Sequence, residues 1–589
     1  MKKAIALLLV TVMVLGIFTA CGGGSGTSGD ALEISFWIPK GEDSTYYLSY
    51  DENPAVKYME TLEFNGRKVD LTFLVPITGS EQDNFNTLLM TDEYADVMDM
   101  TYASSNAAEL YRDDYIWDLT PYVEEYMPNY KRIIDEHPEL AVNVYTNVDG
   151  ENKILSLCAI TEEVLGNFMG LLYRRDWIAK YGTNPETGAA FTWGYTDPSD
   201  FNTWYDDVVF PSGGAEPIYI SDWEWMFEIF TVAMADLGIE DGHCFAPYFK
   251  GFNEDGGGFF SSFGGCAPMW YLGKDGNVSF GGDTESMRSY LQCMNTWYEK
   301  GWMDTSFMEN TGDQPYAVNS ADIHAGKVGA FIGRRAETGG QMDLGDAYTK
   351  DIMVYGARPP MNDIYGDTST QNQTPYSLYQ YSHIRGTSTT ITKAVSEEDL
   401  PTVLTVLDYM YSEEGAPLMC LGMNEEQFNQ TQDETYKKYN ITYAYRTEQN
   451  EDGSTKFIRN EDLIFDNNLA SAMALKRITL GYYYKGFVPA LNESYQLCAR
   501  NAMAEWDYYS NTGYMDSGLL AQFTLEESEL YNKTHANLDT FMSTNVPQFI
   551  TGQLDIDSEE DWGNYCKMLN KYGPQKVSAA YQRVLDSLN

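Results

Sequence analysis

Leu32-Glu33-Ile34-Ser35-Phe36-Trp37-Ile38-Pro39 alternates apolar and polar residues and then stops at a proline, which predicts a strand over 32–39. The pattern returns over 69–76, and a third short apolar run covers 95–100. Helical segments are predicted between these strands, over 55–63 and 83–90. This alternation predicts an α/β fold whose parallel sheet carries helices on both faces.

Ligands of such sheets bind outside the carboxyl ends of the strands. Trp37, Pro76 and Tyr102 fall at those ends. The aromatic residues among them, Trp37 and Tyr102, are therefore candidate ligand contacts.

The rest of the chain continues the mixed pattern. A chain of 589 residues is too long for one core, which predicts two or more domains. The further predicted elements are a helix beginning at Pro121, hairpin turns at 149–150, 275–276 and 452–453, a strand entering a helix over 170–177, a strand over 326–333, and helices over 286–300, 397–412 and 576–588.

The N-terminus has the pattern of an export signal. Lys2 and Lys3 precede an uncharged apolar run over 4–20, which is too short for a comfortable membrane span. Cys21 and a Gly/Ser-rich stretch follow, and together they resemble a bacterial lipoprotein signal. The resemblance implies a signal peptide over 1–20 and a lipidated, palmitate-bearing Cys21 on a flexible tether over 21–30. Phe18 departs from the usual aliphatic residue, and an ordinary secreted protein is the alternative.

Acidic residues dominate the charge. The chain has 38 Lys and Arg against 87 Asp and Glu, a formal net charge of −49. This excludes nucleic acid and anionic membranes as partners, and its long-range field disfavours anionic substrates. Aromatic residues are 14% of the chain, which fits a binding surface built from aromatic faces.

Catalytic and metal-binding motifs are scarce. The seven cysteines after Cys21 are scattered without a CxxC pair, and the five histidines form no HExxH or other ligand spacing. No GxSxG follows a strand. We therefore expect neither a metal nor a cofactor, and no enzymatic activity, although carboxylates are numerous enough that a glycoside hydrolase or lyase remains an alternative.

Six motifs in order resemble those of extracellular solute-binding proteins of the family 1 type. Within that family, the chain most resembles the long lipoproteins of Gram-positive bacteria that serve carbohydrate ABC transporters. Besides the first strand, the matching stretches are Ile116–Tyr122 (the family's D-L-T-P-Y), Tyr173–Trp177, Gly326–Phe331, Val403–Gly415, and Phe549–Gly552 with Asp561–Tyr565.

The resemblance implies a type II periplasmic-binding-protein-like fold, with two α/β lobes joined by crossing strands around a ligand cleft. Lobe one would comprise 31–168 plus 353–425, and lobe two 169–352 plus 426–589. The implied function is capture of an oligosaccharide by a monomer on the outer face of the cell membrane, for delivery to ABC permease subunits. An oligopeptide or another nutrient is an alternative ligand.

Many long members of that family carry an acidic loop that resembles a calcium site. The corresponding stretch here, 208–217, has one carboxylate, from Glu216. Calcium prefers several hard oxygen ligands, so no calcium is predicted there.

Aromatic faces that could cover sugar C–H faces, next to polar groups for the hydroxyls, mark the candidate ligand contacts on lobe two. Trp223 and Trp225 lie next to two carboxylates, Asp222 and Glu224, just after a predicted strand. Both tryptophans and Asp222 are candidates, although the tryptophans could instead begin a buried helix. The Gly-rich stretch 256–265 carries Phe259 and Phe260 and is followed by Trp270, although it could instead be a packed turn. Arg334, or its neighbour Arg335, follows the 326–333 strand and could donate to hydroxyls or form a surface ion pair.

Overall fold

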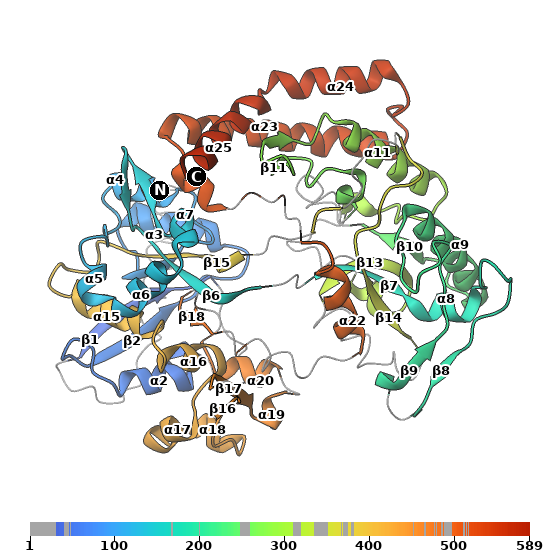
Figure 1. Cartoon of the computed structure of the whole chain (residues 1–589). Helices are drawn as coiled ribbons and strands as arrows, with labels where there is room; N and C mark the ends of the chain where they lie inside the picture. Colours follow the sequence, from blue (N-terminus) through green and yellow to red (C-terminus); the bar gives the residue numbers. More distant parts are fainter. Residues whose placement is uncertain are drawn as a thin grey trace, which may run out of the picture.

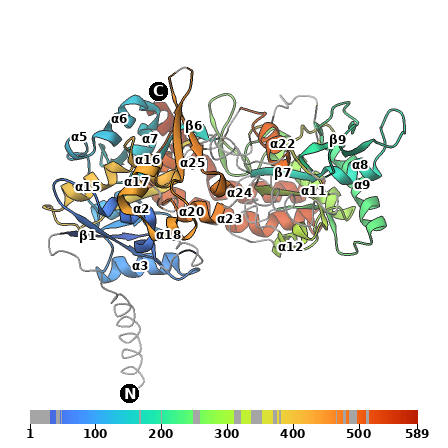
Figure 2. The same cartoon turned by 90° about the horizontal axis from the view of Figure 1, so that it is seen from below.

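The computed structural model describes residues 31–39, 46, 49–165, 169–198, 201–247, 259–309, 320–334, 352–366, 368, 375–377, 382–451, 453–464, 467–475, 478, 480–484, 487, 497–510, 513, 515 and 517–588. They form two α/β lobes that lie side by side in both views (Figures 1 and 2). The predicted fold class is confirmed. Among the described residues, no helix has the length and apolar character that crossing a bilayer requires.

Lobe one is built on a six-stranded mixed sheet. Its order is β18-β6-β15-β3-β1-β2, with bounds β1 (Leu32–Trp37), β2 (Val69–Leu74), β3 (Val97–Asp99), β6 (Leu157–Leu165), β15 (Ser382–Ile391) and β18 (Tyr482–Tyr483). β1 is parallel to β2 and β3, whereas β15 is antiparallel to β3 and β6. The three predicted N-terminal strands are confirmed, each within two residues of its expected ends.

Helices cover this sheet on both faces, as predicted from the alternation. Those that follow the first two strands are α2 (Pro54–Glu60) and α3 (Glu81–Thr91), and the others are α4 (Ala107–Arg112), α5 (Val123–Tyr126), α6 (Pro128–Glu136), α7 (Ala141–Val144), α15 (Leu400–Tyr409), α16 (Gly415–Leu421), α17 (Glu425–Thr431), α18 (Glu434–Lys438), α19 (Glu461–Ile464) and α20 (Asn467–Ala472). The helix predicted at Pro121 begins two residues later and is short, because Pro128 starts a new helix. The apolar side chains of α15 lie in the lobe-one core, as their helical spacing predicted.

Lobe two is built on a four-stranded sheet in the order β10-β13-β7-β14. The bounds are β7 (Met169–Arg174), β10 (His243–Ala246), β13 (Val328–Arg334) and β14 (Val354–Ala357). Its helices are α8 (Arg175–Tyr181), α9 (Ile220–Leu237), α11 (Glu285–Glu299), α12 (Ser320–His324) and α22 (Leu497–Trp506). The predicted strand-to-helix step at 170–177 is therefore β7 followed by α8.

Short hairpins decorate both lobes. They are β4 (Thr146–Val148) with β5 (Glu151–Lys153), β8 (Trp193–Tyr195) with β9 (Trp204–Asp206), β11 (Trp270–Leu272) with β12 (Val278–Phe280), and β16 (Tyr445–Gln449) with β17 (Thr455–Arg459). Gly150, Gly276 and Gly453 have positive φ values at three of the turns, which confirms those hairpin predictions.

The C-terminal helices lie across one side of the molecule (Figure 1). They are α23 (Leu525–Ile550), α24 (Glu559–Lys571) and α25 (Pro574–Leu588), preceded by the 3-10 helix η9 (Ser517–Gln522). Phe549 and Trp562 place them in the lobe-two core. η9 packs against α7 of lobe one, and the Gln522 side-chain amide donates to the Tyr145 carbonyl oxygen. The C-terminal helices therefore bridge the lobes.

The lobe boundaries differ from those expected. Residues 426–487 were expected in lobe two, but Phe428, Tyr436 and Phe487 belong to the lobe-one core, and β18 pairs with β6. Conversely, β14 was expected in lobe one but pairs with β7 in lobe two. Apolar spacing indicates that a segment is buried, but it does not say against which sheet.

Candidate functional site

A cavity of about 420 Å³ lies where lobe one meets the C-terminal helices, at the carboxyl end of β3. Lobe one contributes Met100, Ala103, Ser104, Ser105, Asn106, Ala107, Glu109, Asn143, Thr146, Ser156, Cys158, Ile384 and Ser388. The C-terminal segment contributes Gly518, Leu520, Ala521, Phe523, Ser528, Tyr531 and Asn532. Two bodies that share one cavity are the arrangement expected of a ligand site closed from both sides.

The end of β3 positions the lobe-one wall. The Asp99 carboxylate accepts the Thr101 backbone N–H at 2.8 Å and turns the chain away from the sheet. The Asn86 side-chain amide of α3 donates to the Ser104 hydroxyl at 2.9 Å. Asn106 then caps α4. The loop that reaches the cavity is therefore held at both ends.

The opposite wall depends on the start of α23. Thr524 and Glu527 form a capping box, and Glu527 also accepts Arg583 of α25 at 2.6 Å. One turn further on, Tyr531 lines the cavity. Its ring lies 5.6 Å from that of Trp270, so Tyr531 is held from behind.

The described wall mixes polar and apolar side chains and is almost uncharged. Hydroxyl and amide side chains make up most of its polar groups, and Tyr531 supplies an aromatic ring, whereas Phe523 is only 5% exposed. Glu109 is the only carboxylate among the described lining residues, which include no lysine or arginine. One Glu109 oxygen accepts the Asn106 backbone N–H at 3.1 Å as part of the helix cap. Hydroxyls, amides and aromatic faces suit a ligand rich in neutral hydroxyl groups.

The two candidate contacts on lobe one have different positions. Tyr102 is 38% exposed and directly precedes the cavity loop, but it is not among the described lining residues, so its ligand contact stays a prediction. Trp37 is 1% exposed, packs edge-on against Phe85, and donates from its indole N–H to the Asn84 side chain at 2.8 Å. The structure thus contradicts the contact predicted for Trp37, since no face of the indole reaches solvent.

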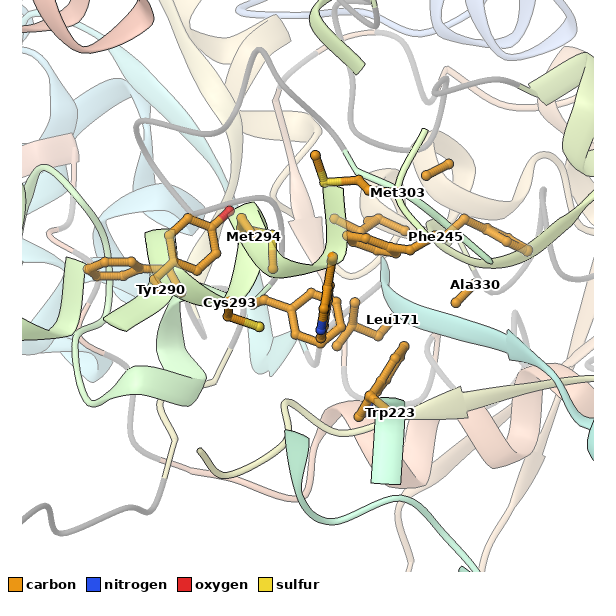
Figure 3. Close-up of a cluster of buried hydrophobic side chains, with 14 of the residues drawn as sticks. Leu171, Trp223, Phe245, Tyr290, Cys293, Met294, Met303 and Ala330 are labelled. Atoms are coloured by element: carbon orange, nitrogen blue, oxygen red, sulfur yellow. The ribbon is translucent and has the colours of Figure 1, made fainter. Parts of the chain in front are cut away.

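Trp223 and Asp222 are structural residues of α9. The helix begins at Ile220, so Trp223 faces the lobe-two core and has no exposed surface (Figure 3). The Asp222 carboxylate is fully buried and accepts the backbone N–H groups of Ser212, Ile218 and Tyr219 at 2.8–3.0 Å. The structure contradicts both predicted contacts, and the alternative of a buried helix start is the arrangement observed.

The aromatic residues after the glycine-rich stretch are also buried. Phe259 and Phe260 have no exposed surface, and Phe259 packs edge-on against Trp223 at 4.8 Å. Trp270 is 7% exposed and donates to the Pro574 carbonyl oxygen at 3.0 Å. The structure contradicts these three contacts, although Trp270 supports the cavity indirectly by packing behind Tyr531. Gly256–Gly258 lie outside the described residues.

Three predicted residues remain. Trp225 is partly buried against the lobe-two core, with its ring 5.6 Å from Phe210. The backbone of Arg334 ends β13 opposite Met169, and neither its side chain nor Arg335 is among the described parts. Cys21, with the signal and tether, also lies outside the described residues.

A buried cation organises the 206–222 loop of lobe two. The Arg175 guanidinium binds both oxygens of Asp206 at 2.6–3.2 Å and donates to the Ala215 carbonyl oxygen at 2.6 Å. It also contacts the Tyr173 hydroxyl, which donates to Glu216 at 2.8 Å. Burial raises the pKa of Glu216 to about 7. The absence of calcium from this loop stays a prediction, for which an unchanged melting temperature in EDTA is the check.

No protein-family model and no curated protein matches the sequence. Solved structures do resemble the fold over nearly its whole length. An extracellular solute-binding protein from Bifidobacterium longum subsp. infantis is 12% identical, with a TM-score of 0.66 over 96% of this chain and 100% of that one.

Two further structures give similar values. The S. pneumoniae ABC-transporter substrate binding protein FusA, as an EF-hand mutant in complex with fructo-nystose, is 15% identical, with a TM-score of 0.64 over 94% of this chain and 99% of that one. The alginate-binding protein AlgQ2 without calcium ion is also 15% identical, with a TM-score of 0.63 over 95% and 99%. The chain therefore has the two-lobed, type II periplasmic-binding-protein-like fold of extracellular solute-binding proteins.

Proposed function

We propose that this protein binds an oligosaccharide between its two lobes and delivers it to the permease of an ABC transporter, without chemical conversion. The observation that carries the proposal is the almost uncharged cavity wall of hydroxyls and amides with the Tyr531 ring, contributed by both lobes. Similar folds include a protein solved with fructo-nystose and a protein named for alginate binding. Because only a closed pair of lobes contacts a ligand on both sides, ligand binding can drive closure without catalysis.

The site of action follows from the N-terminus. Its resemblance to a lipoprotein signal supports attachment to the outer face of the cell membrane through Cys21. Metabolic labelling with a palmitate analogue tests this directly. Label should be incorporated into the wild-type chain and lost in Cys21→Ser, whereas equal labelling of both would contradict the anchor.

The ligand is tested with the soluble chain from Gly22 onward and a panel of oligosaccharides, by calorimetry and by intrinsic tryptophan fluorescence. Saturable binding of one or a few glycans is expected. Ser105→Trp should fill the cavity and raise the dissociation constant at least about tenfold. Ser454→Trp, on the β16–β17 turn away from the cavity lining, is the matched control and should bind like the wild type.

The alternatives give different results. Release of reducing ends from a polysaccharide would overturn the transport-only reading in favour of a hydrolase. Saturable binding of peptides without any glycan binding would show that the ligand is an oligopeptide rather than an oligosaccharide. An oligopeptide requires charges for both termini, and the described cavity wall has one carboxylate and no cation.

A further inference from the structure

Two histidine rings meet next to segments that form the lobe-one wall of the cavity. His137 directly follows α6 and His383 lies in β15, and their ring centroids are 5.7 Å apart. Neither histidine is among the described lining residues, but Ile384, which directly follows His383, is one of them. Asn143, another lining residue, belongs to α7, which follows His137 after the short 3-10 helix η2 (Pro138–Leu140). The histidine pair therefore joins two segments of the cavity wall.

The hydrogen bonds of the two rings show where each can gain a proton. Nδ1 of His383 lies 2.8 Å from the Thr161 carbonyl oxygen of β6, and Nδ1 of His137 lies 2.9 Å from a Glu139 carboxylate oxygen. Glu139 is ionised, since bonds from its own backbone and from the His137 ring hold the pKa of its carboxyl below the usual range. Because both oxygens only accept, both Nδ1 atoms donate, and Nε2 is the atom of each ring that gains a proton on acidification.

The His383 ring also supports the strand that carries it. β15 pairs with β6 at Ser382 and at Ile384, but the register shifts between these two positions and skips His383. The imidazole instead reaches across to the Thr161 carbonyl oxygen of β6. Figure 1 shows β6 leading out of lobe one toward lobe two. The position of this part of β15, and of Ile384 with it, therefore depends on the His383 ring.

One carboxylate serves both rings. Glu139 binds His137 directly, and its charge also reaches His383. The other charged or titratable groups on the elements packed around the pair are Arg132, Glu136, Glu162, Arg385, Tyr482 and Tyr484. Of these, Arg132 and Glu136 form an ion pair with each other at 3.0 Å, and the Arg385 guanidinium lies over the Tyr483 ring at 4.2 Å. Protonation of both histidines places two cationic rings beside a single bound carboxylate, which disfavours their contact.

We propose that the contact between His137 and His383 makes ligand binding depend on pH, and that the affinity falls when both rings are protonated. With a neutral His383, the ring holds β15 against β6 and packs on His137. When His383 gains its second proton, repulsion from the His137 imidazolium separates the rings and displaces Ile384 in the cavity wall. The inference rests on the proposed function and adds a regulation of that same site. Both histidines are positioning residues, since they act through the wall.

The dependence on pH is tested by calorimetry of the soluble chain from Gly22 onward, with the glycan that the panel identifies, at pH 7.5 and 5.5. The wild-type dissociation constant should rise about fivefold on acidification. His383→Gln keeps a donor for the Thr161 carbonyl oxygen but cannot gain a proton, so its dissociation constant should change by less than about twofold. His243→Gln is the matched control and should keep the fivefold change, because this histidine lies on β10 of lobe two, beside Asp304.

A second measurement needs no ligand. In a chain with 13C-labelled histidine, the imidazole signals report the titration of each ring, assigned with the two glutamine variants. His137→Gln should raise the midpoint of the His383 titration, because it removes a competing charge, and Glu139→Gln should lower the midpoint of His137.

The outcomes separate the inference from the proposed function. Independent titration of the two rings, a wild-type dissociation constant that is the same at both pH values, or an unchanged pH dependence in His383→Gln overturns this inference alone. Coupled titration without binding of any glycan supports the coupled pair and overturns the proposed function instead.

Discussion

Arg175 shows how much one side chain organises in lobe two. Its guanidinium and the Asp206 carboxylate are each 4% exposed, so the ion pair is shielded from water. The same group also binds the Ala215 carbonyl oxygen, and thereby ties the start of α8 to the loop that leads into α9. A buried guanidinium with several oxygen partners stabilises a loop through hydrogen bonds as well as charge.

Removing this guanidinium should be costly. Arg175→Met leaves the Asp206 carboxylate buried without its partner, so we expect a loss of about 3–5 kcal/mol in the free energy of unfolding, measured with urea. The exposed pair of Arg446 and Glu448, 4.0 Å apart, provides the control. Arg446→Met should cost less than about 1 kcal/mol. Equal effects of the two substitutions would show that the buried pair is not a special support of the loop.

Glu216 makes stability depend on pH in a stated direction. Its pKa is raised to about 7 from an ordinary value of 4.5, mainly by burial. Between these values the folded chain holds a proton that the unfolded chain has lost. The contribution of Glu216 to stability is therefore full below pH 4.5 and is lost as the pH rises through about 7.

Urea unfolding of the wild type and of Glu216→Gln between pH 4.5 and 8 measures this contribution. The difference between the two should change by no more than about 1.4 kcal/mol per pH unit, with the wild type losing relative stability as the pH rises. A difference that is flat across this range, or that has the opposite slope, would contradict the protonation of Glu216 in the folded chain.

At the scale of elements, the start of α9 decides the role of its residues. Asp222 lies in the first turn, where its carboxylate holds three backbone N–H groups, and Trp223 turns into the core as a result. Asp222→Ala leaves those donors without their acceptor, so we expect about 2–4 kcal/mol less stability. Asp222→Asn keeps one acceptor oxygen and should lose less stability than Asp222→Ala.

The affinity of the Asp222→Ala protein for the glycan distinguishes this structural role from a ligand contact. The folded fraction of Asp222→Ala should bind the glycan with the wild-type dissociation constant. A stable Asp222→Ala protein with weakened binding would return Asp222 to the candidate ligand contacts.

The elements were predictable from the sequence because each has a local cause. The strands at 32–39 and 69–76 alternate and end at proline, and α15 carries its apolar stripe at helical spacing. The roles of Trp37 and Trp223 were not predictable. Strand-end and helix-start tryptophans face either the core or the ligand depending on one or two residues of register, which composition does not fix.

The cavity shows the same limit. Its lobe-one wall follows a predicted strand end, but its second wall comes from Gly518–Asn532, more than 400 positions further along the chain. The Thr524–Glu527 capping box is a local signal for the start of α23, yet nothing local indicates that this helix shares a cavity with the loop after β3. Such a juxtaposition depends on long-range packing rather than on spacing.

At the scale of the whole molecule, the two lobes meet closely at Gly518. A side chain there would place Cβ 2.5 Å from the Val142 carbonyl oxygen of α7 and 2.8 Å from the Asn143 side-chain amide. Only glycine allows η9 to approach α7 this closely.

Gly518→Ala should therefore push η9 away from lobe one. We expect a loss of about 1–3 kcal/mol in stability and a larger radius of gyration by small-angle scattering. Gly563→Ala in α24 is the control, because no atom lies within 4 Å of its Cβ, and it should be neutral or up to about 1 kcal/mol stabilising. Unchanged scattering and stability in Gly518→Ala would mean that the bridge does not hold the lobes together.

The order in which the chain visits the two lobes has a consequence for its synthesis. The lobe-one sheet begins with the strand at Leu32, but its edge strand is formed by Tyr482 and Tyr483. The lobe-two core includes side chains from the helices beyond Leu525. Neither lobe can complete its hydrophobic core while the nascent chain is still being elongated, because contacts between distant segments form only after both have emerged. The polypeptide must therefore remain incompletely folded until translation is nearly finished, which is the state that a secretion channel accepts.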